Sequence, residues 1–165
     1  MEATTTTGSA SGDSATETVA GAFVNAFAEA WRAPVDADHF ADRLERWLEP
    51  DVRLVQPQAP TMVGRRAFRE RFARPLFELM PDLHGTVEGW AASEGTVYIE
   101  LRLEGTVGKR TVTLRSCDRV TLREGRAAQR IAHLDPTPLL TGVALTPRAW
   151  ARALRQQLIA RRRVP

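Results

Sequence analysis

The chain has 165 residues, 43% of them hydrophobic and 26% charged, which is the composition of one globular domain with its own core. Its formal net charge of +3 comes almost entirely from arginines interleaved with acidic residues, so we expect no nucleic-acid partner. No apolar run approaches the ~20 residues of a membrane span, and the first residues lack a basic-then-apolar pattern, so we expect no signal peptide. With Cys117 as its only cysteine, the protein is expected to be cytoplasmic, without disulfides or membrane contacts.

Residues 1–16, mostly Thr, Ser, Ala and Gly without apolar periodicity, predict a disordered tail ahead of two helices. From Thr18 the apolar residues recur at every fourth position, as on one face of a helix. This first stripe consists of Val19, Phe23, Phe27 and Trp31. A second helix is expected to start with Asp36 or Asp38 as its N-cap and to end before Pro50. Its stripe consists of Phe40, Leu44, Trp47 and Leu48.

The following segment predicts a strand, a loop and a third helix. Residues 51–57, with the sequence DVRLVQP, have the pattern of a short strand in which Gln56 is a polar residue on the apolar phase. Residues 58–64 are expected to form a loop and residues 64–82 a helix. Pro75 lies inside this helical pattern and should kink the helix or split it.

Residues 84–135 predict four strands joined by hairpin turns. From Val97 onward, apolar and polar residues alternate, as in a strand with one buried face. If Gly108 begins a two-residue loop, Ile99 pairs with Asp118, and the apolar residues of both strands then share one face. The carboxyl group of Asp118 is therefore expected to point into the core.

The inward position of Asp118 has two interpretations. A buried carboxylate without a partner costs several kcal/mol or changes its pKa. Such a group is either held by a structural hydrogen bond or lines a pocket, and the residues alone leave both alternatives open.

Helices followed by hairpin-connected strands predict an α+β fold with one curved, mainly antiparallel sheet. Three N-terminal helices packed on its concave face would enclose a cone with an apolar interior, a usual site for a small molecule. Residues 136–145 are expected to be a connector, and Thr146 and Pro147 to begin a C-terminal helix with a basic tail in the segment 143–165. The stripe of that helix consists of Trp150, Leu154 and Leu158. Metal-ligand spacings and phosphate-binding loops are missing from the sequence, so no metal and no cofactor is expected.

The chain resembles the SnoaL-like branch of the nuclear-transport-factor-two-like superfamily. The resemblance rests on DVRLVQP after two helices, GRRAFRERF at the start of the third helix, and LREGRAAQRIAHLDPTPLL at the end of the sheet. It covers residues 18–142, so a SnoaL-like domain is expected over residues 17–142. The resemblance implies a cone-shaped barrel with a deep pocket, paired into homodimers through the outer face of the sheet. Its members include polyketide cyclases, ketosteroid isomerases, epoxide hydrolases, dehydratases and non-catalytic binding domains.

Catalytic positions of this superfamily are mostly altered in the chain. By resemblance, the arginine and two aspartates of limonene-type epoxide hydrolases fall on Ile99, Leu101 and Ala132, which implies that this chemistry is lost. The acid of the polyketide ring cyclases also falls on Ala132, and the neighbouring His133 would have to take the place of that acid. A β-bulge after the last hairpin turn would place Arg130 and Ala132 inside, whereas a regular strand would place His133 inside, and the sequence leaves both alternatives open.

By resemblance to ketosteroid isomerases, the chain keeps only half of their catalytic residues. Their oxyanion-stabilising aspartate falls on Asp118, while their general base falls on Gln56, which cannot take up a proton. Their oxyanion tyrosine falls near Phe27, and the only tyrosine of the chain is Tyr98. In an enzyme of this type Asp118 would itself have to be the acid or the base.

Two functional hypotheses follow. The preferred one is a cofactor-independent isomerase, cyclase or dehydratase that acts on a flat, hydrophobic, polyketide- or steroid-like molecule, with Asp118 and His133 as catalytic residues. The expected substrate-binding residues are Gln56, Ser116, Arg130, Phe27, Trp31, Leu101 and Ile99. The alternative is a non-catalytic ligand-binding or dimerisation domain in which Asp118 is paired with Arg130 or another buried donor. An open cavity at Asp118 would favour the enzyme, and a closed ion pair the binding domain.

Overall fold

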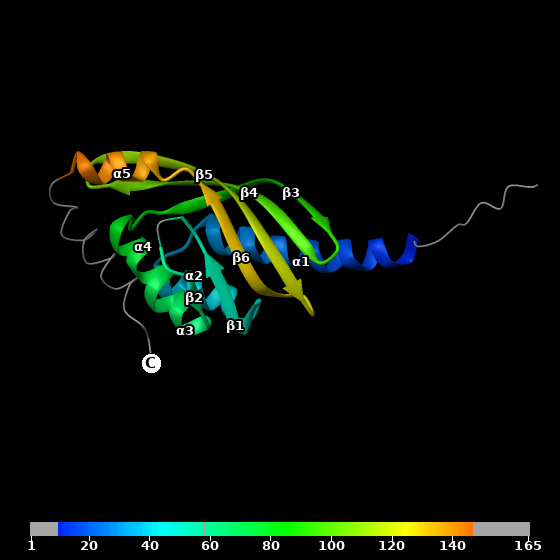
Figure 1. Ribbon diagram of the computed structural model, residues 1–165. Helices are drawn as coiled ribbons and strands as arrows, with labels where there is room; N and C mark the ends of the chain where they lie inside the picture. Colours follow the sequence, from blue (N-terminus) through cyan, green and yellow to red (C-terminus); the bar gives the residue numbers. More distant parts are fainter. Residues whose placement is uncertain (1–9, 58, 147–165) are drawn as a thin grey trace, which may run out of the picture.

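The computed structural model describes residues 10–57 and 59–146 (Figure 1). The helical elements are α1 (Ala10–Arg32), α2 (Ala37–Glu45), α3 (Arg65–Ala67), the π-helix η1 (Phe68–Ala73), α4 (Arg74–Leu79) and α5 (Thr137–Ala144). The strands are β1 (Leu48–Val55), β2 (Met62–Val63), β3 (His84–Ser93), β4 (Thr96–Val107), β5 (Arg110–Arg123) and β6 (Arg126–Leu134). In the described part of the chain, no helix is both long and apolar enough to cross a membrane.

A single sheet of six strands, in the order β2-β1-β6-β5-β4-β3, organises the fold. The strands β1 and β6 run parallel, and all other neighbours are antiparallel. The sheet curves without closing into a barrel, and α1 to α4 lie on its concave side (Figure 1). The predicted α+β class with a mainly antiparallel sheet is thus confirmed, with an open sheet in place of the expected barrel.

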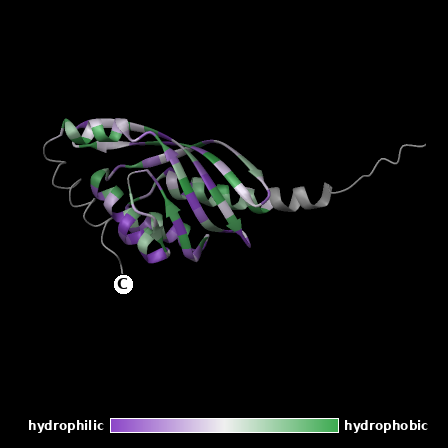
Figure 2. Ribbon diagram, in the orientation of Figure 1, coloured by the Kyte–Doolittle hydropathy of each residue, from purple (hydrophilic) through white to green (hydrophobic). Residues whose placement is uncertain are grey.

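The long hairpin β4–β5 has the predicted register. Ile99 lies opposite Asp118 and Leu101 opposite Ser116, and the turn closes with Val107 opposite Arg110. Buried and exposed residues alternate along both strands, so their hydrophobic residues form one face (Figure 2). That face is the concave face of the sheet.

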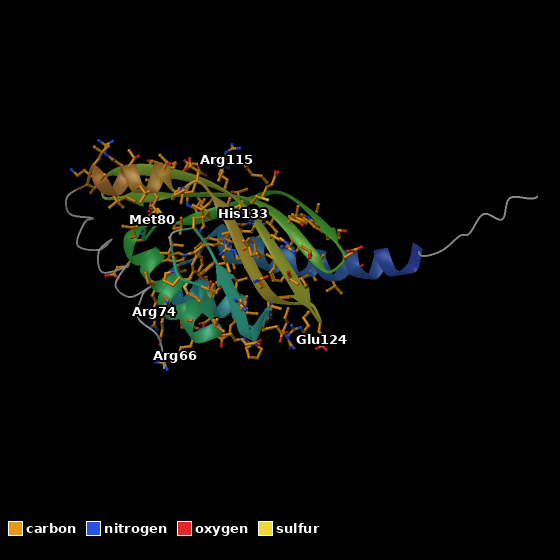
Figure 3. The ribbon with its side chains drawn as sticks, in the orientation of Figure 1. Arg66, Arg74, Met80, Arg115, Glu124 and His133 are labelled. Carbon is orange, nitrogen blue, oxygen red and sulfur yellow. The ribbon has the colours of Figure 1, made fainter. Side chains whose placement is uncertain are left out.

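Side chains fill the space between the sheet and the helices (Figure 3), and a connected group of aromatic rings lies among them. The rings in mutual contact are those of Phe23, Phe27, Trp31, Phe40, Trp47, Phe68, Phe72 and Phe77. The closest pair is Trp31 and Phe40, with ring centroids 4.3 Å apart. The deep chamber expected from the sequence is therefore largely occupied by the core itself.

The boundaries of the first two helices differ from the sequence prediction. Helix α1 begins at Ala10, inside the expected disordered tail, whose residues 1–9 lie outside the described part. Helix α2 is capped by Asp36 as predicted but ends at Glu45, so the predicted continuation to Pro50 was wrong. Pro50 lies in β1 instead, where the register with β6 shifts, and proline is tolerated at such irregular positions.

The predicted third helix is interrupted, as Pro75 indicated. It consists of α3, one turn or so of π-helix in η1, and α4, with Pro75 in the first turn of α4. Proline has no backbone N–H to donate to the preceding helical turn, and departures from a regular α-helix occur at prolines and π-bulges. Part of the predicted loop 58–64 forms the short edge strand β2, which pairs with β1.

Residues 136–145 were expected to be a connector, but most of them form the helix α5. The Asp135 carboxylate accepts a hydrogen bond of 2.9 Å from the Thr137 N–H, and Pro138 lies in the first turn, where its missing N–H costs nothing. Helix α5 packs on β5 through the buried Gly142, where a Cβ atom would come within 2.9 Å of the Val112 side chain. The predicted last helix with Trp150, Leu154 and Leu158 lies outside the described residues.

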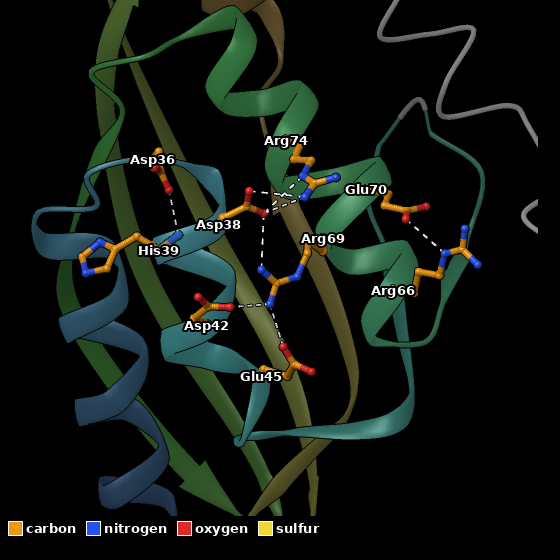
Figure 4. Close-up of polar contacts among 9 residues, drawn as sticks. All are labelled: Asp36, Asp38, His39, Asp42, Glu45, Arg66, Arg69, Glu70 and Arg74. Carbon is orange, nitrogen blue, oxygen red and sulfur yellow. Dashed lines mark hydrogen bonds and ion pairs between the residues drawn. The ribbon is translucent and has the colours of Figure 1, made fainter.

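The π-helix η1 is attached to α2 by a cluster of charged side chains around Arg69 (Figure 4). The Arg69 guanidinium lies 2.5 Å from Asp42, 2.7 Å from Glu45 and 3.3 Å from Asp38. Its hydrogen bond to the Asp42 carboxylate is the main cause that raises the pKa of Arg69 further above its ordinary value. Arg74 of α4 also contacts Asp38, at 3.1 Å, so both η1 and α4 are held to one face of α2.

Asp82, between α4 and β3, holds the start of the sheet to β4. Its carboxylate accepts hydrogen bonds from the Thr106 backbone N–H at 2.7 Å and from the Thr106 hydroxyl at 3.0 Å. Desolvation raises the pKa of Asp82, but the bonds from Thr106 outweigh it and leave the pKa below its ordinary value.

The substitution Asp82→Asn is expected to reduce stability in a pH-dependent manner. Because the folded-state pKa of Asp82 is depressed, its contribution is complete above the unfolded-state pKa of about 4 and is lost as the pH falls through the folded-state value. Asp82→Asn should lower the free energy of unfolding by up to about 1 kcal/mol at neutral pH. Urea unfolding at a series of pH values should show this difference shrinking under acid conditions. The exposed Asp51→Asn serves as the control, and a pH-independent difference would contradict the assignment.

Candidate functional site

The candidate site is centred on Asp118, which the alternation of β5 places on the concave face. The Asp118 side chain is fully buried. Its Oδ1 accepts a hydrogen bond of 2.5 Å from the Ser116 hydroxyl, and its Oδ2 accepts bonds of 2.7 Å and 2.5 Å from Nε and Nη2 of Arg130. Asp118 thus ends in a closed ion pair, which is the arrangement expected under the binding-domain hypothesis.

Arg130 faces inward because β6 contains a β-bulge. Thr121 pairs with Gln129 whereas Leu122 pairs with Ala127, so β6 has one extra residue at this point. The bulge changes the side-chain phase of the rest of β6. As a result Arg130 is buried, and its guanidinium carbon lies 5.9 Å from the ring centre of Phe27 and 5.3 Å from that of Phe72.

The same bulge turns His133 outward. His133 lies opposite Cys117, and both side chains are exposed on the convex face of the sheet. Ala132 instead lies opposite Asp118. The alternative that brought His133 into the pocket was therefore wrong, and His133 cannot act on the same molecule as Asp118.

A cavity of about 220 Å³, which we call the mouth pocket, opens beside the ion pair. Its polar lining residues are Gln56, Arg71, Ser116 and Arg130. Its apolar walls come from the segment after β1, from η1 and α4, from the strands, and from α5: Pro57, Ala59, Pro60, Phe72, Pro75, Leu76, Leu103, Leu114, Leu134, Pro136, Leu139 and Leu140. The described lining contains two guanidinium groups but neither a carboxylate nor a histidine, tyrosine or cysteine.

A second, much smaller space of about 20 Å³, which we call the inner void, lies deeper among the aromatic rings. Phe27 and Trp31 line it, together with Phe23, Phe40, Phe68 and the neighbouring aliphatic side chains. It has room for about one water-sized sphere. Phe72 and Arg130 line both the inner void and the mouth pocket.

The predicted binding residues are thus divided among three places. Gln56, Ser116 and Arg130 meet at the mouth pocket, and Phe27 and Trp31 lie at the inner void. Ile99 and Leu101 are almost fully buried in the core and line neither cavity.

Arg71 and the leucines of α5 were not predicted from the sequence to line the mouth pocket. Arg71 lies next to Phe72 in the π-helix, and the pattern of the predicted helix 64–82 did not show that its side chain would reach a cavity. Leu139 and Leu140 belong to α5, where the sequence pattern predicted a connector. The signal for α5 was available in the first-turn proline and the preceding Asp135.

The open curved sheet with helices on its concave face is the fold of solved structures described as ntf2-like and ketosteroid isomerase-like. The SnoaL-like domain is matched over residues 22–130, and the chain belongs to this family. Similar solved structures include one described as a SnoaL-like polyketide cyclase from Jannaschia sp. CCS1, with a TM-score of 0.68 and 21% identity over 79% of this chain and 94% of that one.

Two further structures show the same fold. TerC, co-crystallised with polyporic acid, has a TM-score of 0.66 and 16% identity over 76% of this chain and 98% of its own. A protein with a ketosteroid isomerase-like fold from Catenulispora acidiphila, in complex with trimethylamine, has a TM-score of 0.59 and 16% identity over 74% of this chain and 92% of its own. None of the curated proteins compared with the chain matches it significantly. At these identities the likeness establishes the fold and not the reaction.

Proposed function

We propose that the protein binds a hydrophobic small molecule in the mouth pocket by hydrogen bonds from Arg130 to a carboxylate or carbonyl oxygen of that molecule. The observation that carries the proposal is that the Arg130 guanidinium, held in place by Asp118, lines an apolar cavity without any described carboxylate in its lining. A guanidinium fixed in this way recognises an oxygen atom with little loss of side-chain entropy.

Arg130 retains hydrogen-bonding capacity for such a ligand. Of its five N–H groups, one on Nε and one on Nη2 point to Asp118. The other three N–H groups of Arg130 have no acceptor within the described part of the chain. The Ser116 hydroxyl donates its hydrogen bond to Asp118, so toward the pocket its oxygen acts as an acceptor for a ligand hydroxyl group.

The walls support a mostly apolar ligand of modest size. Leucine, proline and phenylalanine side chains surround the polar groups, which is the usual composition of a small-molecule pocket. The cavity of about 220 Å³ lies below the ~300 Å³ at which such pockets commonly begin.

One observation favours a second candidate, an enzyme that moves protons on the bound molecule. Ser116 both lines the mouth pocket and hydrogen-bonds to Asp118, so its hydroxyl connects the buried carboxylate to the ligand site. An isomerase, cyclase or dehydratase of the SnoaL-like type could use this connection as a proton path. In such an enzyme Asp118 would not contact the ligand itself, because Ser116 and Arg130 close it off.

Binding of paired probes tests the proposal. The unsubstituted protein should bind 2-naphthoate at least about tenfold more tightly than 2-naphthalenemethanol, since a hydrogen bond to a charged group contributes about 1.5 to 3 kcal/mol. In the double variant Asp118→Leu/Arg130→Met this preference should disappear, while the neutral probe is still bound. Isothermal titration calorimetry measures both constants. A preference that survives the double substitution, or is absent from the unsubstituted protein, would contradict the proposal.

The second candidate is tested with a β,γ-unsaturated ketone, whose conversion to the conjugated isomer needs only proton transfer and raises the ultraviolet absorbance. Under the binding proposal no conversion above the buffer rate is expected. Turnover that is lost in both Ser116→Ala and Asp118→Asn would establish the enzyme instead.

A further inference from the structure

Phe72 and Arg130 together separate the mouth pocket from the inner void, because they are the two residues that line both cavities. The Phe72 side chain is 8% exposed. Its ring lies 5.3 Å from the guanidinium carbon of Arg130 on one side and 5.5 Å, nearly parallel, from the ring of Phe68 on another. The floor of the mouth pocket is therefore a phenyl ring beside an ion-paired guanidinium.

Behind this floor the packing is aromatic and nearly complete. The inner void has a volume of about 20 Å³, and Phe40 closes it from the side of α2 with its ring centre 6.5 Å from that of Phe72. Removing the Phe72 side chain would join the two cavities and lengthen the mouth pocket toward Phe27 and Trp31. Arg130 cannot be removed in the same way without leaving the Asp118 carboxylate buried and unpaired.

The backbone that carries Phe72 is held firmly in place. Phe72 belongs to the π-helix η1, and Arg69 of the same segment is bound by three carboxylates of α2 (Figure 4). Pro75 follows within the first turn of α4 and fixes the chain beyond it. With its backbone anchored on both sides and its ring stacked on Phe68, Phe72 has little freedom to swing out of the ligand's way.

From this geometry we infer that Phe72 is a specificity-determining residue that limits the size of the molecule the mouth pocket accepts. The inference rests on the proposed function, since it concerns the ligand of the same pocket. The class of ligand follows from the floor and the walls: a compact, flat hydrophobic molecule with one acidic or carbonyl oxygen near Arg130, and not one that reaches into the aromatic core.

The test uses benzoate, 2-naphthoate and anthracene-2-carboxylate, which carry the same carboxylate on one, two and three fused rings. In Phe72→Ala, the affinity for the three-ring probe relative to the one-ring probe should rise at least tenfold over the unsubstituted protein. The matched control is Phe77→Ala, which removes an equally buried ring that also contacts Phe40 but lines neither cavity. In this control the ratio should stay within twofold of the unsubstituted value.

The outcomes are distinguishable. If the unsubstituted protein binds none of the three probes, the proposed function is wrong. If it binds them but the ratio is the same in Phe72→Ala, or rises equally in Phe77→Ala, the inference about Phe72 is overturned. Should Phe72→Ala fail to fold, Phe72→Leu, which reduces the side-chain volume less, is expected to raise the ratio at least threefold. An unchanged ratio in Phe72→Leu overturns the inference as well.

Discussion

Replacing Asp118 by alanine is expected to lower the free energy of unfolding by about 3 to 5 kcal/mol at neutral pH. The Arg130 guanidinium would remain between Phe27 and Phe72 without its counter-charge, and a charge left unpaired in apolar surroundings is costly. The Ser116 hydroxyl would lose its acceptor at the same time. Equilibrium unfolding in urea, followed by tryptophan fluorescence, measures the loss.

Two control variants separate the effect of burial from the effect of charge. Glu29→Ala removes an ion pair of 2.6 Å whose side chains are 70% and 56% exposed, and it should cost no more than about 1 kcal/mol. The double variant Asp118→Leu/Arg130→Met removes both buried charges and is expected to recover most of the stability, because a buried pair is often no better than well-packed apolar residues. A loss in Asp118→Ala as small as that in Glu29→Ala would mean that Arg130 finds another acceptor.

The inward position of Asp118 could be predicted because strand geometry is strongly constrained. Side chains alternate with a period of two, and a two-residue turn at Gly108 fixes which residues of β4 and β5 face each other. These two rules are local, so a sequence satisfies or violates them independently of the rest of the fold. The pairing of Ile99 with Asp118 followed from them and is confirmed.

The orientation of β6 could not be predicted, because a single inserted residue reverses it. The bulge lies in the run Ala127-Ala128-Gln129, which contains no glycine or other residue that marks such a site. Without the bulge His133 would have faced the mouth pocket, and with it Arg130 does. The bulge therefore decides the chemistry of the candidate site. Asp118 is neutralised by the guanidinium of Arg130 and does not lie beside the imidazole of His133. No residue type in the sequence marks the bulge.

The filling of the expected cone by aromatic rings could not be predicted from the sequence either. The stripe of the first helix predicted four inward residues. Phe23, Phe27 and Trp31 are buried as predicted, whereas Val19 is 43% exposed, so the prediction was wrong there. Whether inward rings line a chamber or pack against one another depends on the distance between α1 and the other helices, which no local pattern defines. In the structure Trp31 meets Phe40 of α2 at 4.3 Å between ring centres, so the rings fill the space.

Phe40→Ala is expected to cost about 3 to 5 kcal/mol of unfolding free energy. The Phe40 side chain is completely buried and contacts the rings of Trp31, Phe68, Phe72 and Phe77, so it connects α1, α2, η1 and α4. Its removal leaves a cavity that these helices can close only by moving together. Urea unfolding measures the loss, and Tyr98→Ala, which removes an aromatic side chain from a residue that is 44% exposed, should change stability by no more than about 1 kcal/mol.

The same variant separates stability from ligand selection. Phe40 lines the inner void but not the mouth pocket, so its removal enlarges the void while Phe72 and Arg130 still close it off from the ligand. Phe40→Ala should therefore destabilise the protein strongly and leave the ratio of three-ring to one-ring carboxylate binding within about twofold of the unsubstituted value, which is a free-energy change of only about 0.4 kcal/mol. If that ratio instead rose as in Phe72→Ala, the floor of the pocket would depend on the packing of the whole aromatic core and not on the single ring that faces the ligand.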